Sequence, residues 1–463
     1  MVSLEDTGLV DRLAVTLIAV FAVGQLAVLT EAWSKPLLWD SSVYLAMGKW
    51  LFSLGDYGFW ENFRPPVLPL LTGLWWKAGL PFESLRLLST GIATAGLAAV
   101  YRMSGRLFGK TEALFATGIL AASHTYFFFS LNPLTGILAS IFVFAGLYLV
   151  EAQRYTFAGV VLAVAFLTRF PAAIAGPAAV LYIVLEGYSE GELREAVENS
   201  ARLTAGFFTV AAAYLAVQYW FFGSMLSSFL RSASITAGAG SEYLYGLAYF
   251  VKMVKAGPLM VLIPLGIYTV LRDREWKYGG FLVSLLLFYG FFTLFPLKIA
   301  RYTLLFLPLA SLFAGHAAAS MMDRVELDRS LAFRAAVLLL AGLVAWNAWN
   351  GYKAYNWDAV EQQQFFSSVS GLDGDVVASN DPRVNLYGDF RYHPTPPSEL
   401  SELIQQHGSE IDHWAINGRY WDCRGYPDCE ENIAELESYL ERNYVVSSKI
   451  LAGSYNYTIY SRR

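Results

Sequence analysis

Residues 1–352 alternate between long apolar stretches and short polar breaks, whereas residues 353–463 lose that pattern. A helix needs about 20 mostly apolar residues to cross the hydrocarbon core of a membrane. The first stretch lacks a small-residue cleavage site and many others follow it, so we interpret it as an anchor and not as a signal peptide. The pattern predicts about eleven membrane-spanning helices, near residues 13–30, 84–101, 112–130, 133–150, 155–168, 171–187, 203–222, 247–271, 279–296, 300–320 and 335–351.

The polar breaks differ in charge, because Lys and Arg gather in alternate ones. Cytoplasmic loops of membrane proteins carry an excess of these residues, so we expect the basic breaks on the cytoplasmic side. The N-terminus is then cytoplasmic, and an odd number of spans puts residues 353–463 outside. The basic breaks hold Arg12, Arg102, Arg106, Lys110, Arg154, Arg194, Arg202, Arg272, Arg274, Lys277, Arg324, Arg329 and Arg334.

Residues 67–80 are apolar but too short for a span, and Pro65-Pro66 precede them. Counting them as a span would invert every later loop. We therefore predict a helix at the outer membrane interface, a depth that suits Trp75-Trp76. The outer loop 31–83 is the longest connection in this part, and such loops are usually functional. A second outer loop, 223–246, is rich in Ser, Gly and Ala, and it is either a moving lid or a plain connector.

The sequence predicts two regions: a transmembrane domain over 1–352, which includes the loop 31–83, and a small extracytoplasmic α/β domain over 353–463. In the second region, 375–380, 444–450 and 455–461 have the residues of strands, and 398–407 and 432–443 have the period of helices. Cys423 and Cys429 lie there with five residues between them. Outside the cell they would form a disulfide, and a single pair is a weak metal signal.

Composition sharpens this division. Hydrophobic residues make up 56% of the 463 positions and charged residues 15%, against about 25% charged in soluble proteins. Residues 353–463 hold 17 acidic and 9 basic side chains, so their net charge is −8, whereas that of the rest is +3. The composition excludes an ordinary soluble enzyme and a disordered chain. The overall net charge of −5 also excludes a nucleic-acid binder of the basic-patch type.

A sparse set of charges lies on the predicted outer side, where charge near the membrane is costly and usually functional. One carboxylate suits a general base, and several cations suit an anionic head group. Two structural alternatives stay open: Arg and Lys at span ends often extend to the interface, and Asp40 has the position of a helix cap before Ser41. The set is Asp40, Arg64, Arg86, Arg169, Lys298 and Arg301.

The order of these motifs resembles the membrane glycosyltransferases of the GT-C fold. The most similar branch contains the protein O-mannosyltransferases and the aminoarabinose transferase of lipid A. The resemblance covers most of the first 320 residues, and the eleven spans with an external tail agree with it. It rests on Trp39-Asp40 with Tyr44, Gly55-Asp56-Tyr57, Arg64-Pro65-Pro66, Leu131-Asn132-Pro133, Phe166-Leu167-Thr168-Arg169, and the segment from Lys298 to Pro308.

The resemblance implies transfer of one sugar from a polyprenyl-phosphate (dolichyl-phosphate-like) donor to a glycan, lipid or protein acceptor on the outer face, with inversion. Asp40 would be the catalytic residue, which deprotonates or orients the acceptor hydroxyl. Tyr44, Tyr302 and Asn132 would orient the reacting groups. The donor phosphate would be bound by Arg64, Arg301 and Lys298, with Arg169 and Arg86 in second rank.

Two positions depart from the pattern of that family, and the C-terminal region has no clear counterpart in its best-known members. Asp40 is followed by Ser41 where the family often has Glu, and Asn132 stands where it frequently has Asp. No ligand cluster for a metal is apparent, and no cofactor is expected, although a divalent metal is possible. The main alternative is a transporter or flippase of a small or lipid-linked anionic substrate, which the intramembrane charges would also suit.

Overall fold

A computed structural model describes residues 7–238, 247–294, 299–324, 329–356, 360–372, 374–421, 423, 428–452 and 455–463. The chain forms two compact units, and neither is one continuous segment. Unit 1 contains residues 1–32, 62–67 and 86–355. Unit 2 contains 33–61, 68–85 and 356–463. Most of the loop expected at 31–83 therefore folds together with the C-terminal region.

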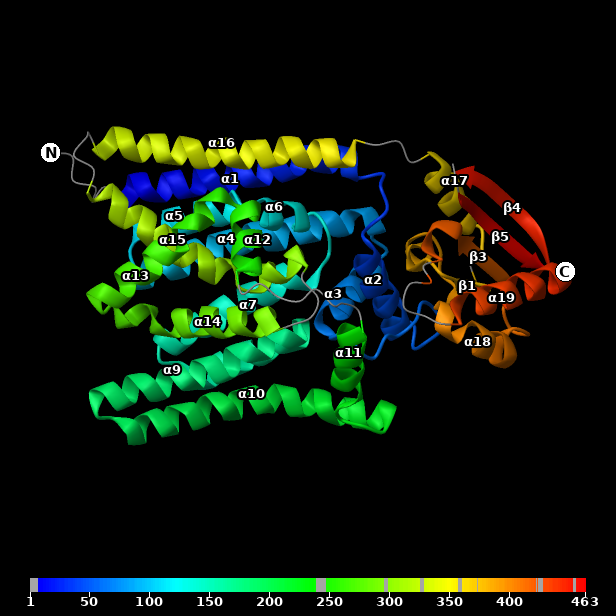
Figure 1. The fold of residues 1–463 in the computed structure, drawn as a ribbon, viewed down its shortest axis with the longest axis horizontal. Coiled ribbons are helices and arrows are strands. Elements are labelled where there is room, and N and C mark those ends of the chain that lie inside the picture. Colours follow the sequence, from blue (N-terminus) through cyan, green and yellow to red (C-terminus); the bar gives the residue numbers. More distant parts are fainter. Residues whose placement is uncertain are drawn as a thin grey trace. The chain divides into compact units, whose positions relative to one another are not determined.

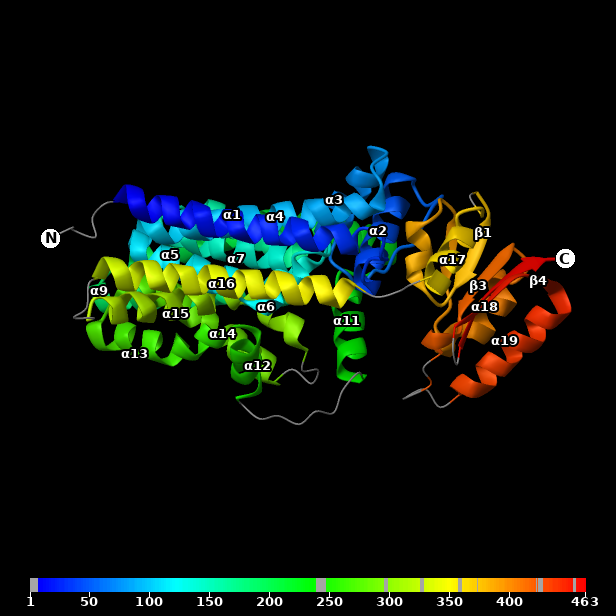
Figure 2. The same cartoon turned by 90° about the horizontal axis from the view of Figure 1, so that it is seen from above.

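Unit 1 is a helical bundle (Figure 1), and each of the predicted apolar stretches is helical in it. Several stretches are broken where Pro or Gly interrupts the apolar run, as at Gly257-Pro258. Its longer helices run along one common direction (Figure 2). The α-helices of unit 1 are α1 Thr7–Ala32, α4 Leu85–Leu107, α5 Lys110–Ala121, α6 His124–Phe129, α7 Thr135–Glu151, α8 Tyr155–Thr168, α9 Ala175–Glu190, α10 Leu193–Phe222, α11 Ser227–Gly238, α12 Ala248–Ala256, α13 Ile263–Asp273, α14 Gly279–Leu294, α15 Leu307–Met322 and α16 Arg329–Tyr355.

Five helical segments among the described residues are long and apolar enough to cross a membrane: Gly8–Ala32, Phe170–Glu190, Leu193–Phe222, Trp276–Leu294 and Leu331–Tyr355. Helices α7, α8 and α15 are apolar but shorter. The prediction of a mostly helical, multi-span membrane bundle is confirmed, while the number eleven stays a prediction.

Small residues let the helices of the bundle approach closely. A Cβ atom added to Gly159 of α8 would collide with the backbone of Leu203 in α10, and one added to Gly206 would collide with Thr156. Close backbone approach at small residues is a main source of helix association in lipid, where burying apolar surface gains little. Aromatic side chains, among them Phe288, Phe292 and Phe306, fill the interior elsewhere.

The C-terminal part of unit 2 is built on a five-stranded mixed sheet with strand order β2-β1-β3-β5-β4. Strands β1 (Val376–Ser379), β2 (Arg391–Pro394) and β3 (His413–Asn417) are mutually parallel. Strands β4 (Tyr444–Ala452) and β5 (Tyr455–Arg462) add an antiparallel hairpin. Trp414 and Leu440 lie in its core. Three helices belong to this part: α17 Val360–Val369, α18 Leu400–His407 and α19 Cys429–Asn443.

The predicted α/β character of residues 353–463 is confirmed, with the strands near 375–380, 444–450 and 455–461 and both helices in place. The sequence interpretation missed α17, β2 and β3. The two strands have only four and five residues, and neither alternates clearly between polar and apolar positions. The structure also joins Cys423 and Cys429 in a disulfide.

The loop part of unit 2 consists mainly of α2 (Trp39–Phe52) and α3 (Val67–Lys77). Gly48 and Gly73 bring their backbones together, since a Cβ on either would lie within 2.9 Å of backbone atoms of the other. Helix α3 has 11 residues, which gives about 16 Å, half of the thickness of the hydrocarbon core. Its length therefore agrees with the prediction that residues 67–80 do not span the membrane.

Candidate functional site

Asp40 is the second residue of α2 and is half-buried. The helix begins at Trp39, its N-cap is Leu38, and no side chain caps it. Asp40 thus lies inside the first turn, where the helix dipole stabilises a carboxylate, and it is not the cap considered from the sequence. Tyr44 follows one turn later on the same side of the helix and is 6% exposed.

Helix α2 is anchored to the C-terminal part of the same unit by Lys49, which is 4% exposed. Its Nζ donates to the carbonyl oxygens of Asn385, at 2.7 Å, and Gly388, at 2.8 Å. The same nitrogen is 2.8 Å from a carboxylate oxygen of Asp389. At the other end of α2, the Trp39 ring packs edge-on against Tyr420, with centroids 5.0 Å apart. Residues far along the chain therefore hold both ends of the helix that carries Asp40.

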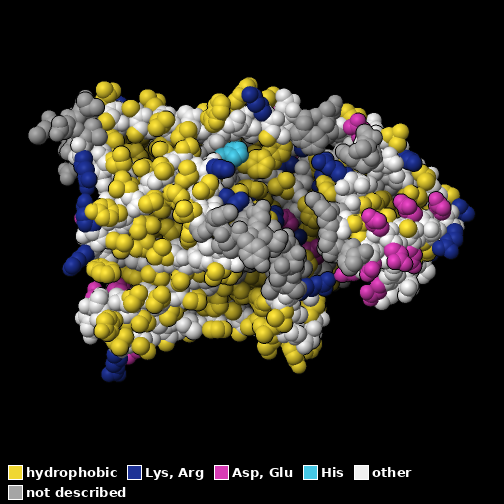
Figure 3. Space-filling model, viewed as in Figure 1, with side chains coloured by type: hydrophobic (Ala, Val, Ile, Leu, Met, Phe, Trp, Pro, Cys, Tyr) yellow, Lys and Arg dark blue, Asp and Glu magenta, His cyan; other side chains and the backbone are white. Residues whose placement is uncertain are grey.

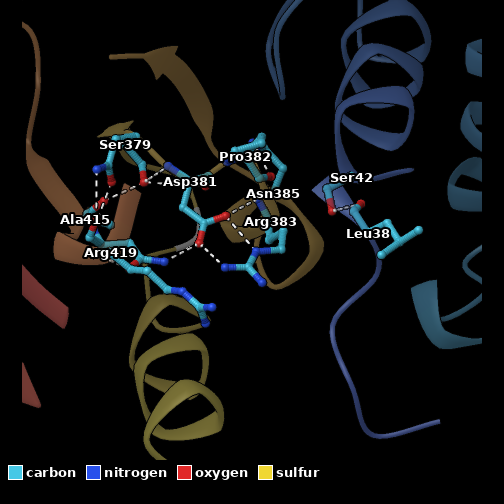
Figure 4. A network of polar contacts seen from close by, with 11 residues as sticks. Leu38, Ser42, Ser379, Asp381, Pro382, Arg383, Asn385, Ala415 and Arg419 are labelled. Carbon is cyan, nitrogen blue, oxygen red and sulfur yellow. Dashed lines mark hydrogen bonds and ion pairs between the residues drawn. The ribbon is translucent and has the colours of Figure 1, made fainter. Parts of the chain in front are cut away.

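A buried polar network lies at the carboxyl ends of β1 and β3 (Figure 4). Asp381 is fully buried and receives two hydrogen bonds from the Arg383 guanidinium, at 2.9 and 2.6 Å. Asn417 donates a third, at 2.8 Å. Burial alone would lower the pKa of Arg383, but the paired Asp381 outweighs it and raises that pKa above its ordinary value. These contacts hold the network in one arrangement.

This network also supports the Asp40 helix. Asp381 accepts from the backbone N–H of Arg383 and so caps the short helix Pro382–Leu386, which contains Asn385. The Arg383 guanidinium lies 5.1 Å from the ring centroid of Tyr420, the residue that packs on Trp39. Removing the Asp381–Arg383 pair would therefore disturb the contact of Asn385 with Lys49 and that of Tyr420 with Trp39.

In unit 1, two predicted phosphate ligands lie together. Arg169 follows α8, and its Nη1 donates to the Thr135 hydroxyl at 3.2 Å. Its guanidinium also lies 5.2 Å from the ring centroid of Tyr302. Arg301 precedes Tyr302 in the short helix Ala300–Leu305. Both arginines are half-buried. The structure thus brings Arg169, Tyr302 and Arg301 to one end of the bundle.

Arg86 and Asn132 form a second group at the same end. Arg86 is fully buried, and its Nη1 donates to Asn132 Oδ1 at 2.9 Å and to the Leu131 carbonyl oxygen at 3.3 Å. Asn132 in turn donates to the hydroxyl of Tyr355 at 2.9 Å. Thr135 lies three positions after Asn132, so one short segment that leads into α7 contacts both Arg86 and Arg169. These contacts favour a structural role for Arg86 over direct binding of a ligand.

Arg64 lies beside a cation that the sequence interpretation did not single out. The guanidinium of Arg64 is 5.6 Å from the Phe63 ring centroid, and that of Arg231, from α11, is 6.0 Å from the same centroid. The sequence interpretation treated 223–246 as a lid or connector, and no motif marked Arg231. Residues 239–246 of that loop lie outside the described residues, as does Lys298.

The opposite end of the bundle carries the basic breaks of the sequence. Lys110 pairs with Asp11 at 2.6 Å, Arg106 bonds to Tyr148, and Lys277 lies near Phe108. Figure 3 shows Lys and Arg gathered at this end, on the left, and a broad apolar surface along the helices. These basic breaks, which the sequence predicted on one side of the membrane, therefore lie at one end of unit 1. Successive helices that cross the membrane in opposite directions require this arrangement.

Among the described residues, no group of three or more His, Cys, Asp or Glu side chains is placed to hold a metal ion. The polar groups at the Arg169 end of unit 1 are instead guanidinium, amide and phenol groups. Such groups donate hydrogen bonds to an anion and pair with phosphate in particular. The arrangement is therefore suited to an anionic head group.

Comparison with known proteins gives a family match and a fold match. Residues 64–220, about a third of the chain, match the family model described as dolichyl-phosphate-mannose-protein mannosyltransferase. No curated protein sequence matches the chain.

Two solved structures resemble the chain over nearly its full length. ArnT from Cupriavidus metallidurans, bound to undecaprenyl phosphate, has 13% identity and a TM-score of 0.67, with 99% of this chain and 98% of ArnT covered. The archaeal oligosaccharyltransferase AglB from Archaeoglobus fulgidus, in complex with an inhibitory peptide and a dolichol-phosphate, has 13% identity and a TM-score of 0.61. The match covers 96% of this chain and 74% of AglB. The resemblance to GT-C glycosyltransferases indicated by the sequence is thus confirmed, and the chain has their fold.

Proposed function

We propose that this protein is a membrane glycosyltransferase that moves a single sugar from a polyprenyl-phosphate donor to an acceptor, with inversion. The main support is the combination of a fold shared along 99% of the chain with ArnT and a family match to dolichyl-phosphate-mannose-dependent enzymes. ArnT was solved with undecaprenyl phosphate and AglB with a dolichol-phosphate, so lipid phosphates bind to proteins of this fold.

The proposed reaction has one displacement step. Asp40 accepts the proton of the acceptor hydroxyl as its oxygen bonds to the anomeric carbon of the donor sugar. The bond between that carbon and the phosphate oxygen breaks, and polyprenyl phosphate leaves with the electron pair. Arg169 and Arg301, with Arg64 and Lys298, stabilise the charge that grows on the phosphate. Tyr44 and Tyr302 orient the reacting groups, and Asn132 with Arg86 fixes the loop that holds Thr135.

The proposed topology puts the reaction on the outer face of the cell membrane. The basic breaks would lie in the cytoplasm, and Asp40 with the C-terminal domain outside. The clustering of Lys110, Arg106 and Lys277 at one end of unit 1 supports this orientation. The test is cysteine-accessibility labelling of intact cells that carry either Glu435→Cys or Arg154→Cys. We expect labelling from outside at Glu435→Cys and not at Arg154→Cys. Labelling of Arg154→Cys from outside, but not of Glu435→Cys, would contradict it.

The function is tested by Asp40→Asn in membranes supplied with polyprenyl-phosphate-linked sugar. We expect transfer to fall by a factor of about 100 or more, because the general base is lost. Asp56→Asn is a matched control, since Asp56 is exposed in the turn after α2. Equal transfer by wild type and Asp40→Asn would reject the assignment. Solute uptake into proteoliposomes without any lipid-linked sugar would instead favour a transporter.

A further inference from the structure

A pocket of about 550 Å³ lies entirely within unit 2, on the flank of α2. This volume is within the range of about 300–1,000 Å³ that is typical of small-molecule sites. Its walls come from α2, from the end of α3 with the segment after it, and from residues 386–389. Because all three belong to one compact unit, the pocket does not depend on how the two units are arranged.

The pocket lies on the opposite side of α2 from Asp40. Lys49 lines it and follows Asp40 by nine residues. Nine residues turn a helix by about 180° and advance it by about 13 Å. A molecule in the pocket is therefore remote from the carboxylate of Asp40, and the pocket is distinct from the position where the sugar is transferred.

The lining combines aromatic rings with one oriented carboxylate. Trp76, Phe82 and Tyr387 line the pocket together with Asp389. The indole Nε1 of Trp76 donates to Asp389 Oδ1 at 3.0 Å, and Lys49 Nζ lies 2.8 Å from the same oxygen. The Asp389 side chain still has 44% of its surface exposed. The carboxylate is thus fixed in direction before any ligand arrives.

This chemistry matches a carbohydrate. A sugar ring has an apolar C–H face, which packs on aromatic rings, and hydroxyl groups, which donate to a carboxylate. The volume exceeds that of one hexose. Two cations line the pocket, Lys49 and the exposed Lys77, and Asp389 neutralises the first of them. A phosphate brought near the Asp389 carboxylate would be repelled.

We propose that this pocket is a saccharide subsite, which binds a sugar unit of the acceptor away from the hydroxyl that reacts. The inference rests on the proposed transferase function and adds that the acceptor is a glycan, not a single amino-acid side chain. Binding at a remote subsite supplies energy that positions the reacting end of a long substrate.

The test uses the full-length protein in nanodiscs and, as the probe, size-fractionated oligosaccharides released from the cell envelope of its host. Calorimetry should detect saturable binding to the wild type. Trp76→Ala and Asp389→Asn should each raise Kd about tenfold or more, since each removes a ring contact or a charged hydrogen bond. Trp33→Phe is the matched control, because Trp33 is exposed in the same unit and does not line the pocket.

Polyprenyl phosphate serves as a second probe and reports whether each variant is folded, so its Kd should not change in any of them. Absence of binding by every glycan fraction, or equal binding to wild type and both variants, would overturn the subsite. With transfer measured in parallel, both variants should raise KM for the acceptor more than they lower kcat. If Asp40→Asn abolishes transfer while Trp76→Ala leaves glycan binding and KM unchanged, the subsite fails and the transferase stands.

Discussion

Each unit of the molecule contains a buried cation that ties segments together, and the two cations differ in how far along the chain they reach. Arg86 in unit 1 bonds to residues 45 and 46 positions later. Lys49 in unit 2 bonds to carbonyl groups 336 and 339 positions later. Arg86 thus ties segments that are near in sequence, whereas Lys49 ties the helix that carries Asp40 to a segment more than 330 positions later.

The difference also appears in where charge is placed. In unit 1 the Lys and Arg side chains described above lie at the two ends of the bundle, and the apolar surface runs between them. Unit 2 buries an ion pair, Asp381–Arg383, inside its folded part. A buried pair adds little net stability, but removing one partner leaves an uncompensated charge. Unit 2 should therefore be the more sensitive of the two to single charge deletions.

The largest expected loss is for Arg383→Met. Asp381 would remain buried without its bidentate partner, which costs about 3–5 kcal/mol. Hydrogen exchange of the full-length protein in nanodiscs should show faster exchange over 376–394 and over α2, with unit 1 unchanged. Arg391→Met is the control, because Arg391 is exposed on β2. If exchange rose equally in both units, the prediction that unit 2 is the more sensitive to a charge deletion would be wrong.

Lys49→Met should have the next largest effect. It takes a charged hydrogen-bond donor, which contributes about 1.5–3 kcal/mol, away from two backbone carbonyls, but the carboxylate it leaves behind, Asp389, is 44% exposed and not buried like Asp381. Exchange should rise in α2 but not in β1 or β3, and sugar transfer should fall with it. Lys49→Arg should recover part of both. Lys449→Met, at an exposed position of β4, should change neither. Normal transfer despite a loosened α2 would show that the anchor is irrelevant to activity.

Arg86→Met should have a smaller effect, limited to unit 1. It removes the hydrogen bond from a charged donor to Asn132, which contributes about 1.5–3 kcal/mol, while the long helices keep their packing. Exchange should rise over 130–135 and at the end of α16, and the affinity for polyprenyl phosphate should drop because Thr135 holds Arg169. A change in α2 without a change in 130–135 would contradict this.

The smallest expected effect is a pH dependence from His393 in unit 2. Burial lowers its pKa, and His407 and Arg391 lower it further. The folded unit therefore binds a proton less readily than the unfolded chain, so stability is complete above the ordinary His pKa of about 6.5 and falls as pH drops below it. After correction for the intrinsic pH dependence of amide exchange, protection over β2 should fall between pH 7.5 and 5.5, and His393→Gln should remove this dependence. His413→Gln should keep it.

The sequence predicted what depends on local pattern. Apolar runs of about 20 residues gave the helices of unit 1, and the period of residues 432–443 gave α19. Asp40, Tyr44 and Arg169 were recognised from the order of short motifs, and their roles stay predictions. The assembly of unit 2 was not predictable in this way, because Lys49 and Asp389 have no signal in their own neighbourhoods. Arg231 was missed for the same reason.

The order of synthesis has a consequence for unit 2. Residues 33–85 leave the ribosome early, and the whole of Arg86–Tyr355 is made before the segment that completes their fold. Until residues 356–463 arrive, the carbonyl groups that receive Lys49 do not exist. A chain interrupted before Asn385 would carry Asp40 on a helix without its anchor, so the proposed transfer would require that residues after 356 be made first.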